Sequence, residues 1–277
     1  MPTDNVCLCG GKRLKGIVEV GNADQPLVTV VTVVFNGQPY VTECLESVLQ
    51  QDYPNIEHIV LDGGSSDGTI NILRQYDDRI AFWKSEPDEG VYDAWNRSLA
   101  EARGEWICFL GVDDVFLPGA VSAYMALAAR NPQAEYLSSQ VRWVRPSGYS
   151  RMIGEPWTWA RFCKRMCAAH VGSMHRRSLY ARLGRYDTSY RSAADYEFLL
   201  RARHGLKAAY MPLTTVVMRA GGVSDVSISL EEARRAKVST GGRNKALAAL
   251  EFYIANVKFA LRPLRYALGR SMARQSH

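Results

Sequence analysis

The sequence predicts an α/β fold: a three-layer α/β/α sandwich with a mostly parallel central sheet and a C-terminal helical extension. Three observations support this class. Short apolar segments alternate with stretches of helical spacing through residue 130. The apolar segments are rich in β-branched residues, as expected of strands buried on both faces. They end in clusters of Gly, Asp, Asn and Ser, which typically turn the chain where a strand ends.

The individual elements follow from the same pattern. The first strand is expected at 27–35 (LVTVVTVVF), where Asn36-Gly37 ends it. A helix with apolar positions from Val41 follows, and Tyr53-Pro54 stops it. Further strands are expected at 56–61, 80–84, 105–110, 207–211 and 214–219, and further helices at 67–76, 91–102, 118–130 and 195–204.

Composition and length fit one large globular domain with an appendage. The chain has 277 residues, of which 47% are hydrophobic and 22% charged. We expect an N-terminal, poorly ordered arm at 1–25, a main domain at 26–225 and a basic amphipathic helical segment at 226–277. We expect neither a transmembrane helix nor a secretory signal, and six scattered cysteines suit a reducing, cytoplasmic protein.

Charge is unevenly distributed along the chain. Residues 233–277 hold ten Lys or Arg and one acid, which gives +9, so the remainder carries −3 of the net +6. A basic tail is attracted to phosphate on a membrane surface or on nucleic acid. The mildly acidic body and the lack of a recognition motif argue against nucleic acid.

Polar clusters follow three of the expected strands. They are Asn36-Gly37, Asp62-Gly63-Gly64-Ser65 and Asp113-Asp114. In open α/β sheets, ligands bind beyond the carboxyl ends of strands, so these clusters predict a nucleotide-diphosphate site. The Asp62 carboxylate can accept a hydrogen bond from a base or ribose, and the glycines let backbone approach a ligand. A single such loop could equally serve only to turn the chain.

Two adjacent carboxylates at Asp113 and Asp114 are costly to bury unless a cation neutralises them. Oxygen ligands of this kind suit Mg²⁺ or Mn²⁺ held jointly with a phosphate. The alternative is a solvated helix start, at which Asp114 acts as a cap.

Other polar residues have two interpretations on residue type alone. Asp93, Asn96 and Arg97 would share one helix face, where Arg97 reaches a phosphate or pairs with Asp93. Asp195 opens an expected helix, where a carboxylate is usually a cap or dipole partner. His170 stands among apolar residues, as a core histidine does.

Taken together, these motifs resemble family 2 glycosyltransferases, inverting enzymes with the Rossmann-like GT-A fold. Five segments match in the family's order between residue 28 and about 220: 31–37, 61–69, 86–106, 109–114 and 170–201. The pattern E-P-D-x-G-x-Y-D-A-x-N is similar to bacterial surface-polysaccharide enzymes of the colanic-acid type. Their acceptors are typically lipid-linked glycans at the cytoplasmic membrane face.

The resemblance implies a role for each matching position. Asp195 stands where the family keeps its catalytic base, and Asp114 where it holds a divalent metal, Mn²⁺ or Mg²⁺. Because this chain reads Gly111-Val112-Asp113-Asp114, it remains open which aspartate contacts the metal. His170 and Glu197 fall on the acceptor or diphosphate side. The nucleotide-binding positions are Val34, Phe35, Asn36, Asp62, Gly63, Gly64, Ser65, Asp93, Asn96, Arg97 and Asp113.

The implied reaction moves a hexose from a nucleotide-diphosphate sugar, UDP-sugar favoured, to a hydroxyl of a glycan or lipid-linked acceptor. Asp195 removes the acceptor proton, and the metal stabilises the leaving diphosphate. Two other classes compete. A non-catalytic nucleotide-sugar-binding protein would be expected to lack Asp114 or Asp195, and both are present. A sugar nucleotidyltransferase would need a basic phosphate loop after the first strand, which Asn36-Gly37-Gln38-Pro39 is not.

The C-terminal segment carries two apolar stripes. Leu247, Leu250, Ile254, Val257, Leu261, Leu264 and Leu268 recur at 3-4 spacing, and Phe252, Phe259 and Tyr266 lie on roughly the opposite face. We expect one stripe to pack on the main domain. The other, flanked by Lys258, Arg262 and Arg265, would meet anionic lipid or a second subunit, although a terminal bundle packed wholly on the body is the alternative. Pro263 is expected to divide the segment into two helices.

Overall fold

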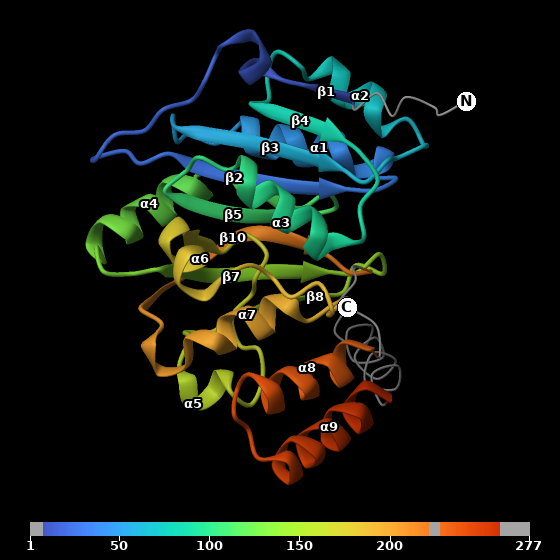
Figure 1. Cartoon of the computed structure of the whole chain (residues 1–277), viewed down its shortest axis with the longest axis vertical. Helices are drawn as coiled ribbons and strands as arrows, with labels where there is room; N and C mark the ends of the chain where they lie inside the picture. The colour runs from blue at the N-terminus through green and yellow to red at the C-terminus, as the bar shows by residue number, and fades with distance from the viewer. Residues whose placement is uncertain (1–7, 222–227, 261–277) are drawn as a thin grey trace, which may run out of the picture.

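The computed structural model describes residues 8–221 and 228–260. Within them, one mixed ten-stranded sheet has the order β1-β4-β3-β2-β5-β9-β7-β10-β6, with β8 beside β7 (Figure 1). Its parallel centre consists of β4 (Phe82–Ser85), β3 (Ile56–Asp62), β2 (Val28–Val34) and β5 (Trp106–Gly111). The other strands are β1 (Leu8–Gly10), β6 (Val115–Phe116), β7 (Tyr136–Val144), β8 (Ser150–Ile153), β9 (Met174–Arg176) and β10 (Ala208–Arg219).

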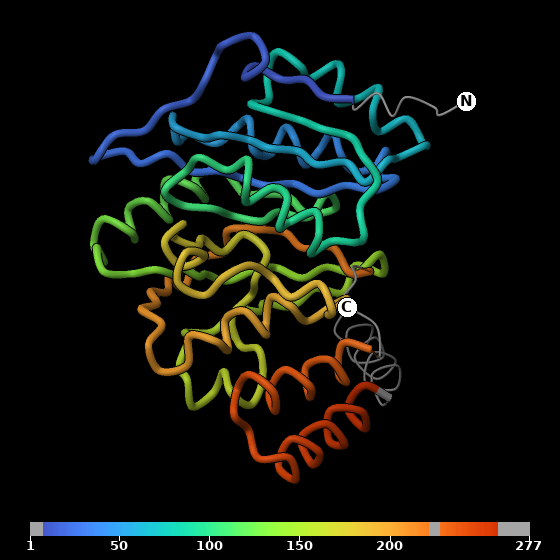
Figure 2. Tube along the Cα trace, in the orientation of Figure 1, coloured from blue at the N-terminus to red at the C-terminus, as the bar shows by residue number. Residues whose placement is uncertain are grey.

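Helices cover both faces of the sheet (Figure 2). Successive side chains of β2 point to opposite faces, so Val31 packs under one helical layer and Val30 under the other. One layer contains α1 (Gln38–Leu49), α2 (Thr69–Gln75) and α4 (Ala120–Arg130). The other contains α3 (Val91–Glu101), α6 (Arg177–Leu183) and α7 (Ala194–Ala202). The predicted α/β/α sandwich with a mostly parallel central sheet is confirmed.

The structure corrects the prediction of two short strands at 207–211 and 214–219. These segments form one strand, β10, whose register with β7 shifts between Tyr210 and Thr214 and again before Val216. Pro212 lies in the irregular part, where the missing N–H leaves no ladder bond to lose.

The N-terminal segment is also more ordered than expected. Residues 8–10 pair antiparallel with β4 as the edge strand β1, and a 3-10 turn follows at Lys12–Lys15. The Arg13 guanidinium reaches the buried Glu57 carboxylate at 2.7 Å, which ties this segment to β3. These contacts join residues far apart in sequence, so local periodicity gave no signal for them.

The last two helices, α8 (Ile228–Ser239) and α9 (Lys245–Ala260), lie together at the end of the molecule opposite β1 (Figure 1). Ala236 of α8 joins the core beneath α7, and Ala248 of α9 is fully buried. The short helix α5 (Trp159–Phe162) lies near the same end. The expected boundary at 225/226 and positions 261–277, including Pro263, lie outside the described residues.

Candidate active site

The carboxyl ends of β2, β3, β4 and β5 form one edge that carries the predicted nucleotide-binding positions. Val34, Asp62 and Ser85 are neighbours in register across β2, β3 and β4. The loops beyond them are joined by hydrogen bonds. The Asn36 N–H donates to Ser65 Oγ at 2.7 Å, and the Ser66 N–H donates to Asn36 Oδ1 at 2.9 Å. Asn36 has φ +50°, which turns the chain sharply after β2.

Asp62 organises this edge from a buried position. Its Oδ2 accepts hydrogen bonds from the Gly64 and Ser65 N–H groups and from the Ser85 hydroxyl, at 2.6–3.0 Å. Its Oδ1 accepts one hydrogen bond, from the Ser65 hydroxyl at 2.5 Å. The Gly64 and Ser65 backbone therefore wraps around a carboxylate whose Oδ1 can accept a further donor. Nearby, Phe35 is 66% exposed, which leaves its ring free to stack.

Asp113 and Asp114 follow β5 at the same edge and converge over Gly111. A Cβ atom on Gly111 would lie 2.7 Å from Asp114 Oδ2 and 3.0 Å from Asp113 Oδ1. Burial raises the pKa of Asp113, and burial together with the Asp113 charge raises that of Asp114 well above its usual range. Arg219 opposes this shift, because its N–H donates to Asp114 Oδ1 at 3.0 Å and its guanidinium to the Asp113 carbonyl at 2.7 Å.

This donor set fits a divalent cation shared with a substrate. Two converging carboxylates whose pKa values are both raised gain from a nearby positive charge. Among the described residues, no cluster of three His, Cys, Asp or Glu side chains could hold a metal by itself. Mg²⁺ and Mn²⁺ commonly take one or two carboxylates and complete their shell with water and phosphate oxygens. A diphosphate beside Asp113 and Asp114 would supply the missing ligands.

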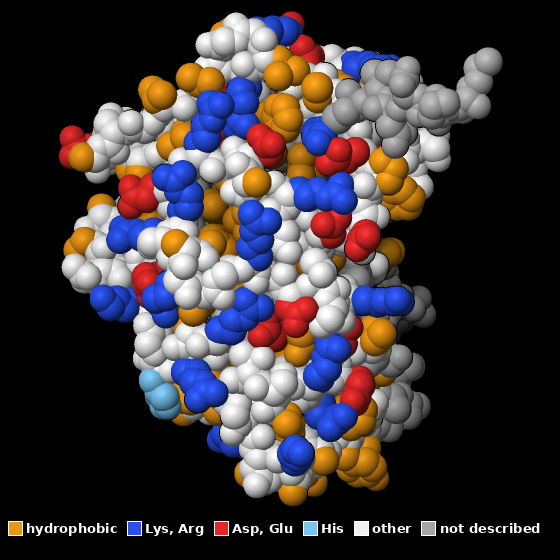
Figure 3. Space-filling model, viewed as in Figure 1, with side chains coloured by type: hydrophobic (Ala, Val, Ile, Leu, Met, Phe, Trp, Pro, Cys, Tyr) orange, Lys and Arg blue, Asp and Glu red, His pale blue; other side chains and the backbone are white. Residues whose placement is uncertain are grey.

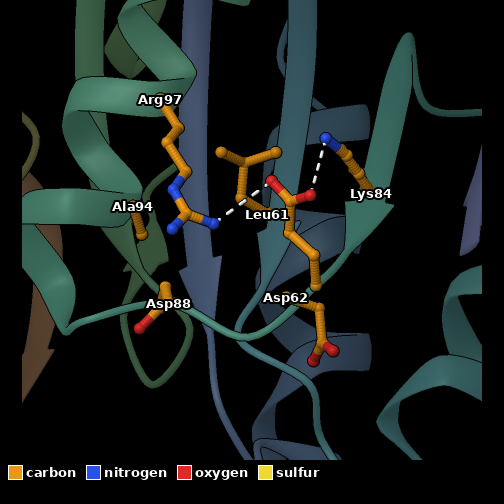
Figure 4. Close-up of a pocket in the computed structure, with 7 residues that line it drawn as sticks. Leu61, Asp62, Lys84, Asp88, Ala94 and Arg97 are labelled. Carbon is orange, nitrogen blue, oxygen red and sulfur yellow. Dashed lines mark hydrogen bonds and ion pairs between the residues drawn. The ribbon is translucent and has the colours of Figure 1, made fainter. Parts of the chain in front are cut away.

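A small pocket beside Asp62 brings together residues from β3, β4 and α3 (Figure 4). Lys84 and Arg97 reach into it from opposite sides and both pair with Glu86, at 2.7 and 3.2 Å. Arg97 also pairs with Asp93 at 2.7 Å, the i, i+4 contact that the sequence allowed. Two cations lie within reach of this pocket, and an anionic ligand could compete with Glu86 for them.

Asn96 lies on the same helix but faces the protein interior. Its Nδ2 donates to the Tyr186 carbonyl, and its Oδ1 accepts the Tyr186 N–H, each at 2.9 Å. Both ends of the amide are therefore used to hold the backbone before α7. This arrangement favours a structural role for Asn96 over the predicted contact with nucleotide.

Asp195 lies in the first turn of α7, beside α3. Tyr92 Oη donates to Asp195 Oδ1 at 3.2 Å, so the E-P-D-x-G-x-Y motif and the A-D-Y-E motif meet here. His170 is buried nearby and stacked on Trp95, with ring centroids 4.8 Å apart. Burial lowers the pKa of His170, and the Asp195 charge opposes that shift, so the two groups lie within electrostatic range.

The Glu197 side chain contacts Arg201 and Thr240, although Glu197 is only two residues from Asp195. It forms a bidentate ion pair with Arg201 on the next helical turn. It also accepts a hydrogen bond from the Thr240 hydroxyl at 2.8 Å. These contacts link α7 to the end of α8, so they favour a structural role over the predicted one on the acceptor side.

Sequence reasoning missed three residues of this site. Arg219 holds the two aspartates from β10, which lies 105 residues away. Tyr92 holds Asp195, and Lys84 faces Arg97. Lys84 stands at the end of a predicted strand, so its position could have marked it as a residue of this site. Contacts of Arg219 and Tyr92 depend on the packing of distant segments and left no local pattern.

The model of glycosyl transferase family 2 matches residues 29–182, which include every strand end described above. The chain belongs to this family. An uncharacterized glycosyltransferase of Mycobacterium tuberculosis is 37% identical over 182 residues, covering 64% of this chain and 69% of that protein. A PGL/p-HBAD biosynthesis glycosyltransferase of the same species is 27% identical over 230 residues, covering 78% and 86%. These relatives do not support the narrower colanic-acid resemblance.

Two solved structures share the GT-A fold with this family 2 chain. S. aureus TarS 1-349 in complex with UDP-GlcNAc gives a TM-score of 0.64 at 18% identity, covering 82% of this chain and 70% of that one. The mannosyltransferase PcManGT from Pyrobaculum calidifontis, in complex with GDP-Man and Mn²⁺, gives 0.58 at 19% identity, covering 96% and 86%. At these identities the likeness shows the fold alone.

Proposed function

We propose that this family 2 glycosyltransferase is a metal-dependent, inverting hexosyltransferase that uses a nucleotide-diphosphate sugar, with UDP-sugar favoured. One observation carries the proposal: Asp113 and Asp114 converge at the edge that also bears Asp62 and its loop. This edge offers a hydrogen-bond acceptor for a base and carboxylates for a metal–diphosphate complex. TarS bound UDP-GlcNAc and PcManGT bound GDP-Man with Mn²⁺, which supports the same donor class here.

In this proposal each residue has a separate task. Phe35 stacks on the base, and Asp62 Oδ1 accepts its N–H. Asp113 and Asp114 hold Mn²⁺ or Mg²⁺, which stabilises charge on the leaving diphosphate. Asp195 removes the proton of the acceptor hydroxyl, whose oxygen attacks the anomeric carbon from the face opposite the diphosphate. An α-linked donor therefore gives a β-linked product.

A thermal-shift screen of UDP, GDP, dTDP and CMP, each with and without Mn²⁺, tests the donor site. A ligand that binds only the folded state raises the free energy of unfolding by about 2.7 kcal/mol when its concentration is a hundredfold above its Kd. We expect one nucleotide to raise Tm only with Mn²⁺, and Asp114→Asn to abolish the rise. Equal shifts with and without metal would contradict metal dependence.

Turnover is tested separately from binding. Release of nucleotide diphosphate from the matching sugar donor reports transfer to an acceptor, or to water. We expect Asp195→Asn to keep the thermal shift but to lower kcat at least a hundredfold, the usual scale of a lost general base. Full activity in Asp195→Asn would remove it as the base. Binding with no turnover in the unaltered chain would favour the binding-protein alternative.

The proposal extends to a lipid-linked acceptor at the cytoplasmic face of the membrane. The described part of the chain has no helix that is long and apolar enough to span a bilayer. An exposed aliphatic stripe nevertheless runs along α9, where Figure 3 shows hydrophobic side chains beside basic ones. The Arg234 guanidinium of α8 lies over the Phe252 ring, so that side of α9 faces α8, whereas the stripe on the other side is exposed among the described residues. The stripe comprises Leu247, Leu250, Ile254 and Val257.

Co-sedimentation with liposomes tests this surface. We expect the full chain to bind vesicles that contain anionic lipid and to be released by high salt. Leu250→Ser with Ile254→Ser should weaken binding, whereas Val18→Ser, an exposed apolar residue near the other end, should not. Unchanged binding by the double variant would exclude the stripe, and a concentration-dependent dimer would favour a second subunit there.

A further inference from the structure

A closed series of hydrogen bonds lies beneath Asp195, between the sheet and α7. His170 Nε2 lies 3.2 Å from Tyr186 Oη, which lies 3.0 Å from Tyr180 Oη. Tyr180 Oη lies 2.6 Å from His175 Nδ1. His175 Nε2 lies 3.3 Å from Ser173 Oγ, which donates to the His170 carbonyl at 2.7 Å. The series therefore begins and ends at His170, and all of its members are buried.

One bond in the series has a fixed direction. A carbonyl oxygen can only accept, so the single hydroxyl proton of Ser173 points to the His170 carbonyl. Ser173 Oγ must then accept from His175 Nε2, and that nitrogen carries a proton. His175 is fully buried, and burial lowers its pKa well below the usual range, so the ring is neutral. Its Nδ1 therefore has a lone pair.

The remaining protons follow in order. Tyr180 must donate to the lone pair of His175 Nδ1, and its oxygen is then free to accept. Tyr186 donates its own proton to Tyr180, so Tyr186 Oη accepts from His170 Nε2. Burial keeps both phenols protonated, because it raises the pKa of each well above its usual range. Ser173 thus determines the tautomer of His170 through four successive hydrogen bonds.

The series places a proton on His170 Nε2, and burial lowers the pKa of the ring, which favours the neutral form with a lone pair on Nδ1. The titratable groups near it are Asp195, Tyr186 and His175. Trp95 and Phe109 stack on its ring. Nδ1 forms no hydrogen bond with a described residue, and it is not among the fully buried polar atoms that lack a partner. The lone pair is therefore accessible beside Asp195.

We propose that His170 is a substrate-positioning residue whose Nδ1 accepts a hydrogen bond from a sugar hydroxyl bound beside Asp195, and that the Ser173–His175–Tyr180–Tyr186 series holds it in this tautomer. The assignment rests on the proposed function. A lone pair attracts an O–H donor and has nothing to give a diphosphate oxygen, which is itself only an acceptor. His170 Nδ1 therefore cannot donate to a diphosphate oxygen, whereas a sugar hydroxyl can donate to it.

Nitrogen NMR of the ligand-free chain tests the tautomer without any need for turnover. Long-range ¹H–¹⁵N spectra distinguish the two neutral forms of histidine from the cation, and His170→Phe assigns the signal among five histidines. We expect His170 to stay neutral and Nε2-protonated between pH 5.5 and 8, a range chosen around the usual histidine pKa. A proton on Nδ1, or titration near pH 6.5, would overturn the proposal.

Kinetics tests the contact itself. His170→Phe keeps the aromatic stack but removes both nitrogens, and we expect kcat/KM to fall about tenfold while nucleotide binding is unchanged. Tyr186→Phe should produce a mixture of His170 tautomers and a smaller fall. Tyr124→Phe, a buried tyrosine on α4, is the matched control. Unchanged kcat/KM in His170→Phe would overturn the contact, whereas a chain that transfers no sugar but shows the expected tautomer would contradict only the proposed function.

Discussion

Asp114 illustrates the conflict between stability and function at the scale of one residue. Its carboxylate is buried beside that of Asp113, and its pKa is raised well above the usual range by burial and by its neighbour's charge. A group with a raised carboxyl pKa destabilises the folded state at neutral pH, since the folded protein holds the charged form less well than the unfolded chain. A bound divalent cation would favour the charged carboxylate and would therefore stabilise the folded state.

We therefore predict that Asp114→Asn stabilises the metal-free protein at pH 7, by about 1 kcal/mol, while it abolishes stabilisation by Mn²⁺ with nucleotide. Asparagine keeps an oxygen for the Arg219 N–H, which donates to Asp114 Oδ1 at 3.0 Å. Urea unfolding with and without Mn²⁺ and UDP measures both effects. Asp113→Asn is the comparison, and its effect should be smaller because Asp113 is less buried. Destabilisation of the metal-free Asp114→Asn protein would show that the burial argument fails.

At the scale of elements, α8 holds the loop that leads into α7. The buried Glu232 carboxylate of α8 accepts the N–H groups of Arg191 and Ser192, both at 2.8 Å. It also accepts the Ser192 hydroxyl at 3.1 Å. Asp195 follows three residues later, so the helix outside the family match at 29–182 helps to position the proposed base.

Glu232→Gln tests this link, because an amide can accept fewer of these three hydrogen bonds and brings N–H donors that face other donors. We predict a loss of about 1–3 kcal/mol in unfolding free energy and a fall in kcat that exceeds any change in nucleotide affinity. Glu231→Gln is the matched control, since Glu231 is exposed and pairs with Arg234 on its own helix. Equal effects in the two variants would contradict a positioning role for Glu232.

Elements differ in how far their sequence predicts them. The strands at 28–34, 56–62 and 106–111 were predicted within two residues because each is rich in apolar residues and buried on both faces. β1 was not predicted, because an edge strand of three residues is specified by its partner β4. The role of Asn96 was missed for the same reason. Its partner Tyr186 lies 90 residues away, and helical spacing describes only the helix face that Asn96 shares with Arg97. Strand ends are predictable, whereas contacts between distant segments are not.

At the scale of the whole molecule, buried histidines make stability depend on pH. His58 lies in β3 under α1, where its Nε2 lies 3.1 Å from Thr32 Oγ1 and its Nδ1 has no partner. Burial lowers its pKa to about 3. Thr32 contacts Cys44 at 3.7 Å, and Cys44 donates to the Gly111 carbonyl at 3.5 Å, so the packing around His58 continues to the edge that bears Asp114.

The direction of this pH dependence follows from the two protonation states. The unfolded chain takes up a proton on His58 below about pH 6.5, whereas the folded chain does so only near pH 3. The stability that His58 contributes is therefore complete above pH 6.5 and is lost as pH falls from 6.5 toward 3, by about 2 kcal/mol at pH 5. We predict that His58→Gln reduces the difference in unfolding free energy between pH 7.5 and pH 5 by about this amount, although it destabilises the protein at pH 7.5. His204→Gln, which changes an exposed histidine, should leave the difference unaltered. If His58→Gln shows the full pH dependence of the unaltered chain, His58 is not buried as a neutral group, and the loss of stability in acid comes from other residues.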